Sequence, residues 1–145
     1  MALLFCYGSN HPGQLAERLG HATTNTGAYA PGWARVFRGW SERWGGGVAS
    51  LVRMKDVTTY GYVAQVTASD LETMDVYEGV ATGHYDRATI DVVVGSTKKK
   101  ATVYLANARE KNKPSKAYLT AIAKTIGAFW EGSDGPVKPS DITIR

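Results

Sequence analysis

Two short stretches of this sequence combine residue types that could hold and transform an anionic substrate. The first is the turn Tyr7-Gly8-Ser9-Asn10, which follows an apolar run and precedes a proline. A glycine turn that leads from a strand into a helix leaves backbone N–H groups unpaired at the positive end of the helix dipole, where a carboxylate or phosphate can bind. Ser9 or Asn10 could instead simply cap the helix, which is a common use of these residue types.

The second stretch surrounds Glu78, which we expect at the C-terminal end of a helix. Gly79 and Gly83 make the following loop free to bend, and Tyr77 and Tyr85 could shield the carboxylate from water. The negative end of the helix dipole and partial desolvation both disfavour a charged carboxylate, which brings it closer to the point where it can take and give a proton. An exposed acid beside a C-cap glycine is the alternative.

Other chemistry has less support in the sequence. Cys6 could act as a nucleophile with a histidine, but no spacing selects one of His11, His21 and His84. A buried strand cysteine is the commoner role. The three histidines and the single cysteine show no ligand spacing, so we expect no metal site.

Two basic stretches could contact nucleic acid by stacking and phosphate pairing, residues 33–40 and the run Lys98–Lys100. The alternation along residues 33–39 favours a half-buried strand instead, and the lysine run suits a solvated hairpin tip. The net charge is only +4, well below the usual nucleic-acid footprint. We therefore do not expect nucleic acid as a partner.

Hydrophobic patterning predicts the elements that must position these residues. A capping box of Ser69 and Glu72 is expected to open the helix that ends near Gly79, with Leu71, Met74 and Val76 as its apolar residues. Other helices are expected at residues 12–19 and beyond Pro114, with strands at 2–6, 33–39, 48–54, 60–66, 85–94 and 101–106. Strands with few interspersed helices indicate the α+β class.

The size and composition of the chain suit one globular domain. It has 145 residues, 43% of them hydrophobic and 21% charged. We expect residues 1–131 to form this domain and residues 132–145 to form a C-terminal tail or edge segment of it. No apolar run is long enough to cross a membrane, and the N-terminus lacks the features of a signal peptide. A single cysteine suits a reducing compartment, so we expect a cytoplasmic protein.

Taken together and in order, these pieces resemble the γ-glutamylcyclotransferase family, including its AIG2-like relatives. The resemblance extends over about residues 3–130, and the Tyr-Gly-Ser turn combined with Glu-Gly-Val is its most specific part. The matching stretches are residues 5–10, 33–37, 60–63, 74–80, 83–85, 103–105 and 114–118.

The resemblance implies an α+β fold, a small mixed β-barrel with flanking helices, and an enzyme that converts γ-glutamyl amides into 5-oxoproline and a free amine. It implies that Glu78 is the catalytic acid/base. It also implies that the γ-glutamyl end of the substrate is bound by the backbone of Tyr7, Gly8, Ser9 and Asn10. It also implies a pocket lined by Tyr85, Tyr104 and Tyr118. The expected partner is the small-molecule γ-glutamyl substrate, no cofactor is required, and the chain is expected to be a monomer or a homodimer.

This chemistry agrees with the reasoning from the residues. The substrate's own α-amine closes a five-membered ring, and correct placement of such partners can remove about 7–11 kcal/mol from a barrier. One carboxylate can take the proton from the amine and give one to the leaving group.

Three points stay open at this level. His11-Pro12-Gly13 departs from the apolar residue that the family usually has after the turn, which puts the start of the first helix in question. A catalytically inactive AIG2-like binding module is the alternative function. The leaving amine, whether an amino acid, a lysine side chain or cysteinyl-glycine, is not selected by these motifs.

Overall fold

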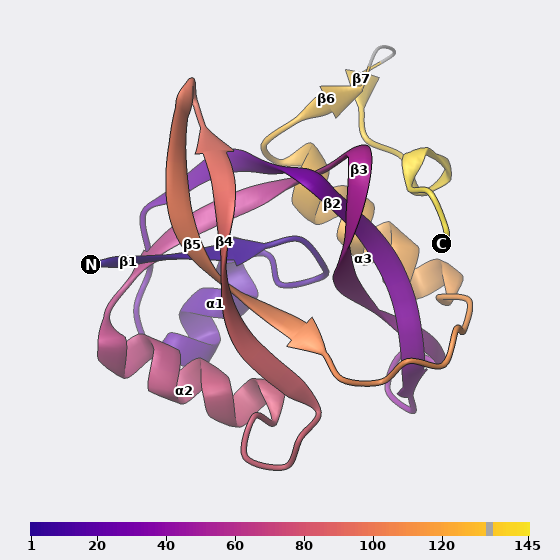
Figure 1. Ribbon diagram of the computed structural model, residues 1–145, viewed down its shortest axis with the longest axis horizontal. Helices are drawn as coiled ribbons and strands as arrows, with labels where there is room; N and C mark the ends of the chain where they lie inside the picture. Colours follow the sequence, from indigo (N-terminus) through magenta and orange to yellow (C-terminus); the bar gives the residue numbers. More distant parts are fainter. Residues whose placement is uncertain (133–134) are drawn as a thin grey trace.

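Five strands close into a barrel in the computed structural model, which describes residues 1–132 and 135–145. Around the barrel the strands follow the order β1-β3-β2-β4-β5 (Figure 1). The β1–β5 pair is parallel and the others are antiparallel. The predicted α+β fold, a small mixed barrel with flanking helices, is confirmed. The strands are β1 (Ala2–Cys6), β2 (Asn25–Ser41), β3 (Gly46–Val66), β4 (Tyr85–Val94) and β5 (Thr97–Ala106).

The β2–β3 hairpin is longer than the sequence pattern predicts. The predicted strands at 48–54 and 60–66 are parts of the single strand β3, because residues 54–57 form an irregularity in the strand and pairing with β2 resumes at Thr58. A register shift between Pro31 and Trp33 accompanies the positive φ of 64° at Asp56. Such irregularities bend a strand, which lets one hairpin curve around the barrel.

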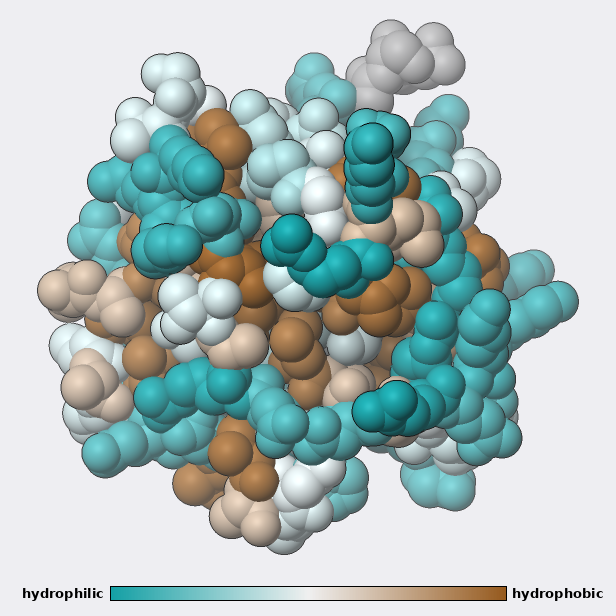
Figure 2. Space-filling view, in the orientation of Figure 1, coloured by the Kyte–Doolittle hydropathy of each residue, from teal (hydrophilic) through white to brown (hydrophobic). Residues whose placement is uncertain are grey.

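The β4–β5 hairpin also differs from its prediction. β5 begins at Thr97, so the exposed lysines 98–100 lie at the start of a strand and not in the turn. Figure 2 shows hydrophilic residues gathered over this hairpin. Lys98 and Lys100 form ion pairs with Asp91 of the neighbouring strand, which partly neutralises the basic run.

Two helices lie side by side on the barrel, and a third packs on its other flank (Figure 1). They are α1 (Pro12–Leu19), α2 (Ala68–Glu78) and α3 (Lys116–Gly127). Helix α1 starts and ends as predicted: Gly20 caps its C-terminus with a φ of 79°. Its N-cap is His11, whose Nδ1 accepts the Gln14 N–H at 3.2 Å.

The N-terminus of α2 is capped two residues earlier than predicted. Thr67 Oγ1 accepts the N–H of Asp70, and the Asp70 carboxylate accepts the N–H of Thr67. The predicted box of Ser69 and Glu72 is wrong, because the chain turns into the helix directly after β3 ends at Val66. Val76, one of the apolar residues expected on this helix, is 80% exposed.

The C-terminal segment packs beside α3 and contains short elements. These are β6 (Glu131–Gly132), β7 (Gly135–Pro136) and the 3-10 helix η1 (Pro139–Asp141), followed by the buried Ile142. Residues 133 and 134 of the predicted tail lie outside the described residues. In the described part of the chain, each helix is too short or too polar to cross a bilayer.

Candidate active site

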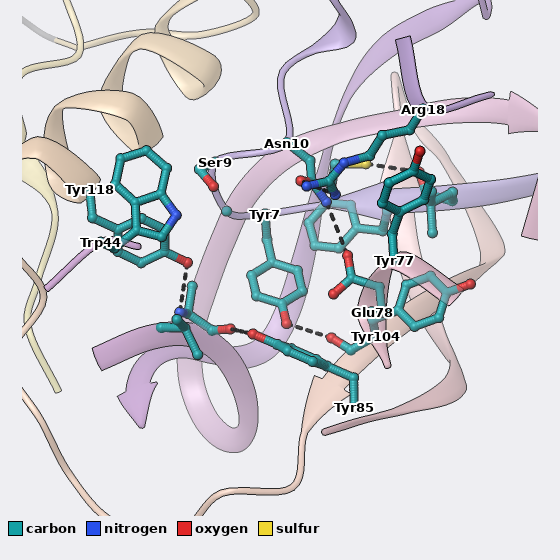
Figure 3. Close-up of a pocket in the computed structure, with 16 residues that line it drawn as sticks. Tyr7, Ser9, Asn10, Arg18, Trp44, Tyr77, Glu78, Tyr85, Tyr104 and Tyr118 are labelled. Atoms are coloured by element: carbon teal, nitrogen blue, oxygen red, sulfur yellow. Dashed lines mark hydrogen bonds between the residues drawn. The ribbon is translucent and has the colours of Figure 1, made fainter. Parts of the chain in front are cut away.

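A pocket of about 160 Å³ lies beside the turn that connects β1 with α1 (Figure 3). It brings together every site residue predicted from the sequence, although these come from distant parts of the chain. The predicted residues in its lining are Tyr7, Gly8, Ser9, Asn10, Glu78, Tyr85, Tyr104 and Tyr118. Sequence reasoning missed further lining residues, among them Arg18, Trp44, Val48 and Ala49.

The glycine turn presents free backbone donors. Because His11 caps α1, Ser9 and Asn10 are not used as helix caps. Within the described residues no protein acceptor takes the N–H of Gly8, Ser9 or Asn10. Arg35 also fixes the start of the turn, since its Nε donates to the Tyr7 carbonyl at 2.8 Å. The trans peptide then points the Gly8 N–H away from Arg35.

Glu78 faces this turn across the pocket. It is the last residue of α2, and Gly79 ends the helix with a φ of 68°. Asn10 Nδ2 donates to Glu78 Oε1 at 3.3 Å. Burial raises the pKa of the half-buried Glu78 carboxyl, while the Asn10 hydrogen bond and the charge of Arg18 partly oppose the rise. This carboxylate is therefore both desolvated and anchored.

Arg18 continues this polar chain toward the mouth of the pocket. Its Nη1 donates to Asn10 Oδ1 at 3.3 Å, and its guanidinium carbon lies 4.9 Å from the centre of the Tyr77 ring. One asparagine side chain thus links the arginine to Glu78 (Figure 3). In the sequence, only the spacing of three residues between Leu15 and Arg18 points to Arg18 as a lining residue, because this spacing puts both side chains on the same helix face.

Tyrosine hydroxyls close the inner wall of the pocket. Tyr118 Oη accepts the Ala49 N–H at 2.8 Å, and Tyr85 Oη donates to the Ala49 carbonyl at 3.4 Å. Tyr7 Oη donates to the Tyr104 carbonyl. Burial raises the pKa of Tyr7 and Tyr85, and it raises the pKa of Tyr118 to about 12. These phenols therefore stay protonated and can donate hydrogen bonds near neutral pH.

Tyr104 contributes to the site differently from the other tyrosines. Its hydroxyl donates to Asp75 Oδ1 at 2.7 Å and lies 3.2 Å from the Leu71 carbonyl, both on α2. Asp75 also accepts two hydrogen bonds from Arg87, which hold its pKa below the usual range. Tyr104 therefore anchors, through its side chain, the helix that ends at Glu78.

The structure does not assemble the alternative cysteine chemistry. Burial raises the pKa of the Cys6 thiol to about 12, so it stays protonated. The histidines bond elsewhere: His11 caps α1, His21 contacts Asp70, and His84 contacts Thr82. The described residues contain no cluster of three or more side chains arranged to hold a metal ion.

Comparison with known proteins relates this chain to a family. A family model described as the AIG2-like family matches residues 58–129, about half of the chain, and includes Glu78. None of the curated proteins matches the sequence.

Solved structures share the fold over nearly the whole chain. A γ-glutamyl cyclotransferase is 24% identical with a TM-score of 0.80, covering 97% of this chain and 96% of that one. An uncharacterized protein from Homo sapiens is 26% identical with a TM-score of 0.79, covering 87% of this chain and 80% of that one.

A yeast γ-glutamyl cyclotransferase specific to glutathione is more distant. It is 12% identical with a TM-score of 0.66, covering 97% of this chain and 93% of that chain. The family-model match confirms the AIG2-like resemblance found in the sequence, and the solved structures share the barrel fold of this chain.

Proposed function

We propose that this protein is a cyclotransferase that converts a γ-glutamyl amide into 5-oxoproline and the free amine, with Glu78 as the general acid/base. One observation carries the proposal. The desolvated Glu78 carboxylate lies in the same pocket as the free N–H groups of the Tyr7–Asn10 turn, and Asn10 joins the two at 3.3 Å. An anion site and a proton carrier are the two groups that this reaction needs.

The turn is suited to the α-carboxylate of the γ-glutamyl half. The N–H groups of Gly8 and Ser9 stand at the start of α1, where the helix dipole adds to their attraction for an anion. Holding that carboxylate fixes the α-carbon and brings the α-amine toward Glu78. The chain of the substrate then folds back so that its amine meets its own γ-carbonyl.

Glu78 carries the protons in the proposed reaction. It takes a proton from the α-ammonium group, and the freed nitrogen pair attacks the γ-carbonyl carbon. The new carbon–nitrogen bond closes the ring, and the old amide bond breaks as its nitrogen receives the proton from Glu78. Glu78 then removes the second proton that the ring nitrogen still carries, which leaves the neutral lactam, and passes it to the released amine, which departs as an ammonium ion. No water is consumed. The raised pKa of Glu78 suits both directions of transfer.

The inner wall offers a donor for the carbonyl oxygen. Tyr118 Oη accepts a hydrogen bond from the Ala49 N–H, which leaves its own proton available to donate. Burial keeps that phenol protonated, since its pKa is about 12. We therefore assign Tyr118 to stabilising the charge that develops on the γ-carbonyl oxygen.

Replacement of Glu78 by Gln tests the proposal. Purified protein is expected to release 5-oxoproline from γ-glutamyl-alanine, and Glu78→Gln is expected to lower kcat by about a thousandfold. Unchanged turnover in this variant would remove Glu78 from the mechanism. Absence of 5-oxoproline from a panel of γ-glutamyl amides would instead favour the inactive binding module.

The stability of the same variant provides a folding control. Burial raises the pKa of Glu78 in the folded protein, so its charged form costs folding free energy at pH 7, and this cost disappears in acid. Thermal unfolding of Glu78→Gln at pH 7 is expected at the same or a higher temperature than for the parent protein. The difference should shrink below about pH 4.

A further inference from the structure

The two ends of the pocket differ in chemistry and in exposure. One end is formed by Ser9, Trp44 and Tyr118, and the other by Arg18 and Tyr77, with Glu78 between them (Figure 3). Tyr118 is only 5% exposed, whereas Tyr77 is 55% exposed. The first end therefore reaches the buried Tyr118 and is called the closed end, while the second reaches the exposed Tyr77 and is called the open end.

Arg18 brings a positive charge that forms no direct ion pair in the described part of the chain. The ion pairs of the described residues involve other cations, and none joins Arg18 to a carboxylate. Only its Nη1 has a protein acceptor there, the Asn10 amide oxygen. Stacking on Tyr77 orients the plane of the guanidinium, which leaves Nε and Nη2 free to bind an anion in a forked arrangement.

We infer that Arg18 is a specificity residue that binds a carboxylate of the leaving amine, so that the preferred substrates are γ-glutamyl amino acids or peptides and not neutral γ-glutamylamines. The inference rests on the proposed cyclotransferase function. It places the leaving amine of the substrate at the open end of the pocket.

The placement of Glu78 supports this orientation. The acid must reach both the α-amine and the leaving nitrogen, so it must stand between the two halves of the substrate. The closed end, with the glycine turn, suits the γ-glutamyl half that is common to all substrates. Arg18 bonds the side chain of Asn10, the last residue of that turn, and the same amide bonds Glu78.

Two substrates that differ in a single group test the inference. γ-Glutamyl-alanine has a carboxylate on its leaving amine, and γ-glutamyl-alaninamide has a neutral carboxamide of nearly the same shape. The measured quantity is the ratio of kcat/KM for the two. The parent protein is expected to prefer γ-glutamyl-alanine by about tenfold, and Arg18→Gln to bring the ratio close to one.

The ratio separates recognition from acid/base chemistry. Arg18 also lowers the pKa of Glu78 through its charge, so its loss changes proton transfer for both substrates. That change cancels in the ratio. Arg53→Gln is the matched control, because Arg53 also stacks on an aromatic ring, that of Trp33, but lies outside the pocket lining. This variant should keep the preference of the parent protein.

A second measurement uses the unaltered protein and needs no variant to fold. Raising the salt concentration from about 0.05 M to about 0.5 M should reduce the preference for the carboxylate substrate, since salt screens partly exposed charges. Arg18→Lys, which keeps the charge but loses the fork, should show an intermediate ratio.

Two results would overturn the inference. An unchanged ratio in Arg18→Gln, with or without an equal loss of activity on both substrates, would show that Arg18 does not contact the leaving group. If the parent protein consumes neither substrate nor any other γ-glutamyl amide, the proposed function itself fails and the inference fails with it.

Discussion

Asn10 decides how the two charged side chains of the pocket meet. Its amide nitrogen donates to Glu78 while its amide oxygen accepts from Arg18, so the arginine and the carboxylate share one neutral spacer and do not form a direct ion pair. A direct pair would hold the pKa of the carboxyl low. With the spacer, burial remains the largest influence on the pKa of Glu78, and the net shift is upward.

Removal of the spacer should shift the pH dependence of catalysis. With Arg18 also replaced by Gln, so that no direct ion pair can form, Asn10→Ala deletes a hydrogen bond that lowers the pKa of Glu78, and that pKa should rise further. A proton acceptor with a higher pKa loses activity at a higher pH, so the acidic limb of the kcat/KM profile should move upward. Profiles of the Arg18→Gln protein with and without Asn10→Ala, measured on γ-glutamyl-alanine, check this. A limb that stays in place or moves to lower pH would contradict the assignment.

Helix α2 is the element that carries the acid to the pocket, and both of its ends are fixed. The Thr67–Asp70 capping box holds the start, and Asp70 also contacts His21 at 2.7 Å. Toward the other end, Asp75 is bonded by Arg87 and by the Tyr104 hydroxyl, one turn before Glu78. The patterning of this helix predicted its existence and its C-terminal end, but not its cap or these anchors.

The position of the capping box can be tested with two neighbouring hydroxyl residues. Thr67→Ala removes the side chain that accepts the Asp70 N–H, and this should lower the free energy of unfolding by about 1 kcal/mol. Ser69→Ala removes a hydroxyl that caps nothing and should change stability by less than about 0.5 kcal/mol. Denaturant unfolding of both variants measures the difference. A larger loss of unfolding free energy in Ser69→Ala than in Thr67→Ala would instead support a cap at Ser69, the position predicted from the sequence.

The barrel as a whole depends on a close approach of backbones beneath the site. A methyl group at Gly61 of β3 would collide with the carbonyl oxygen of Cys6 at the end of β1. Gly61 also uses its own carbonyl to accept the Trp130 indole N–H at 2.8 Å. The strand that leads into the Tyr7–Asn10 turn is therefore held in place by a residue more than fifty positions away.

Substitution at this contact should affect the fold and not only the site. Gly61→Ala is expected to destabilise the protein by about 3 kcal/mol or more, because two strands must move apart. Gly8→Ala is the comparison: its methyl group would meet Ala49 and the Tyr118 hydroxyl at 3.6 and 3.7 Å, which is ordinary contact. Gly8→Ala should fold normally while narrowing the pocket. Equal thermal stability of the two variants would contradict this account of barrel closure.

The sequence alone determined the family resemblance, the α+β class, most elements, and the residues of the glycine turn and Glu78. These depend on local patterns and on motifs that keep their order along the chain. Only the tertiary structure showed that the hydroxyl of Tyr104 bonds to helix α2 and that Arg18 lies in the pocket. It also showed that His11, and not Ser9 or Asn10, is the N-cap of α1. These facts depend on which segments barrel closure brings together, and residues tens of positions apart leave no local pattern that records their contact.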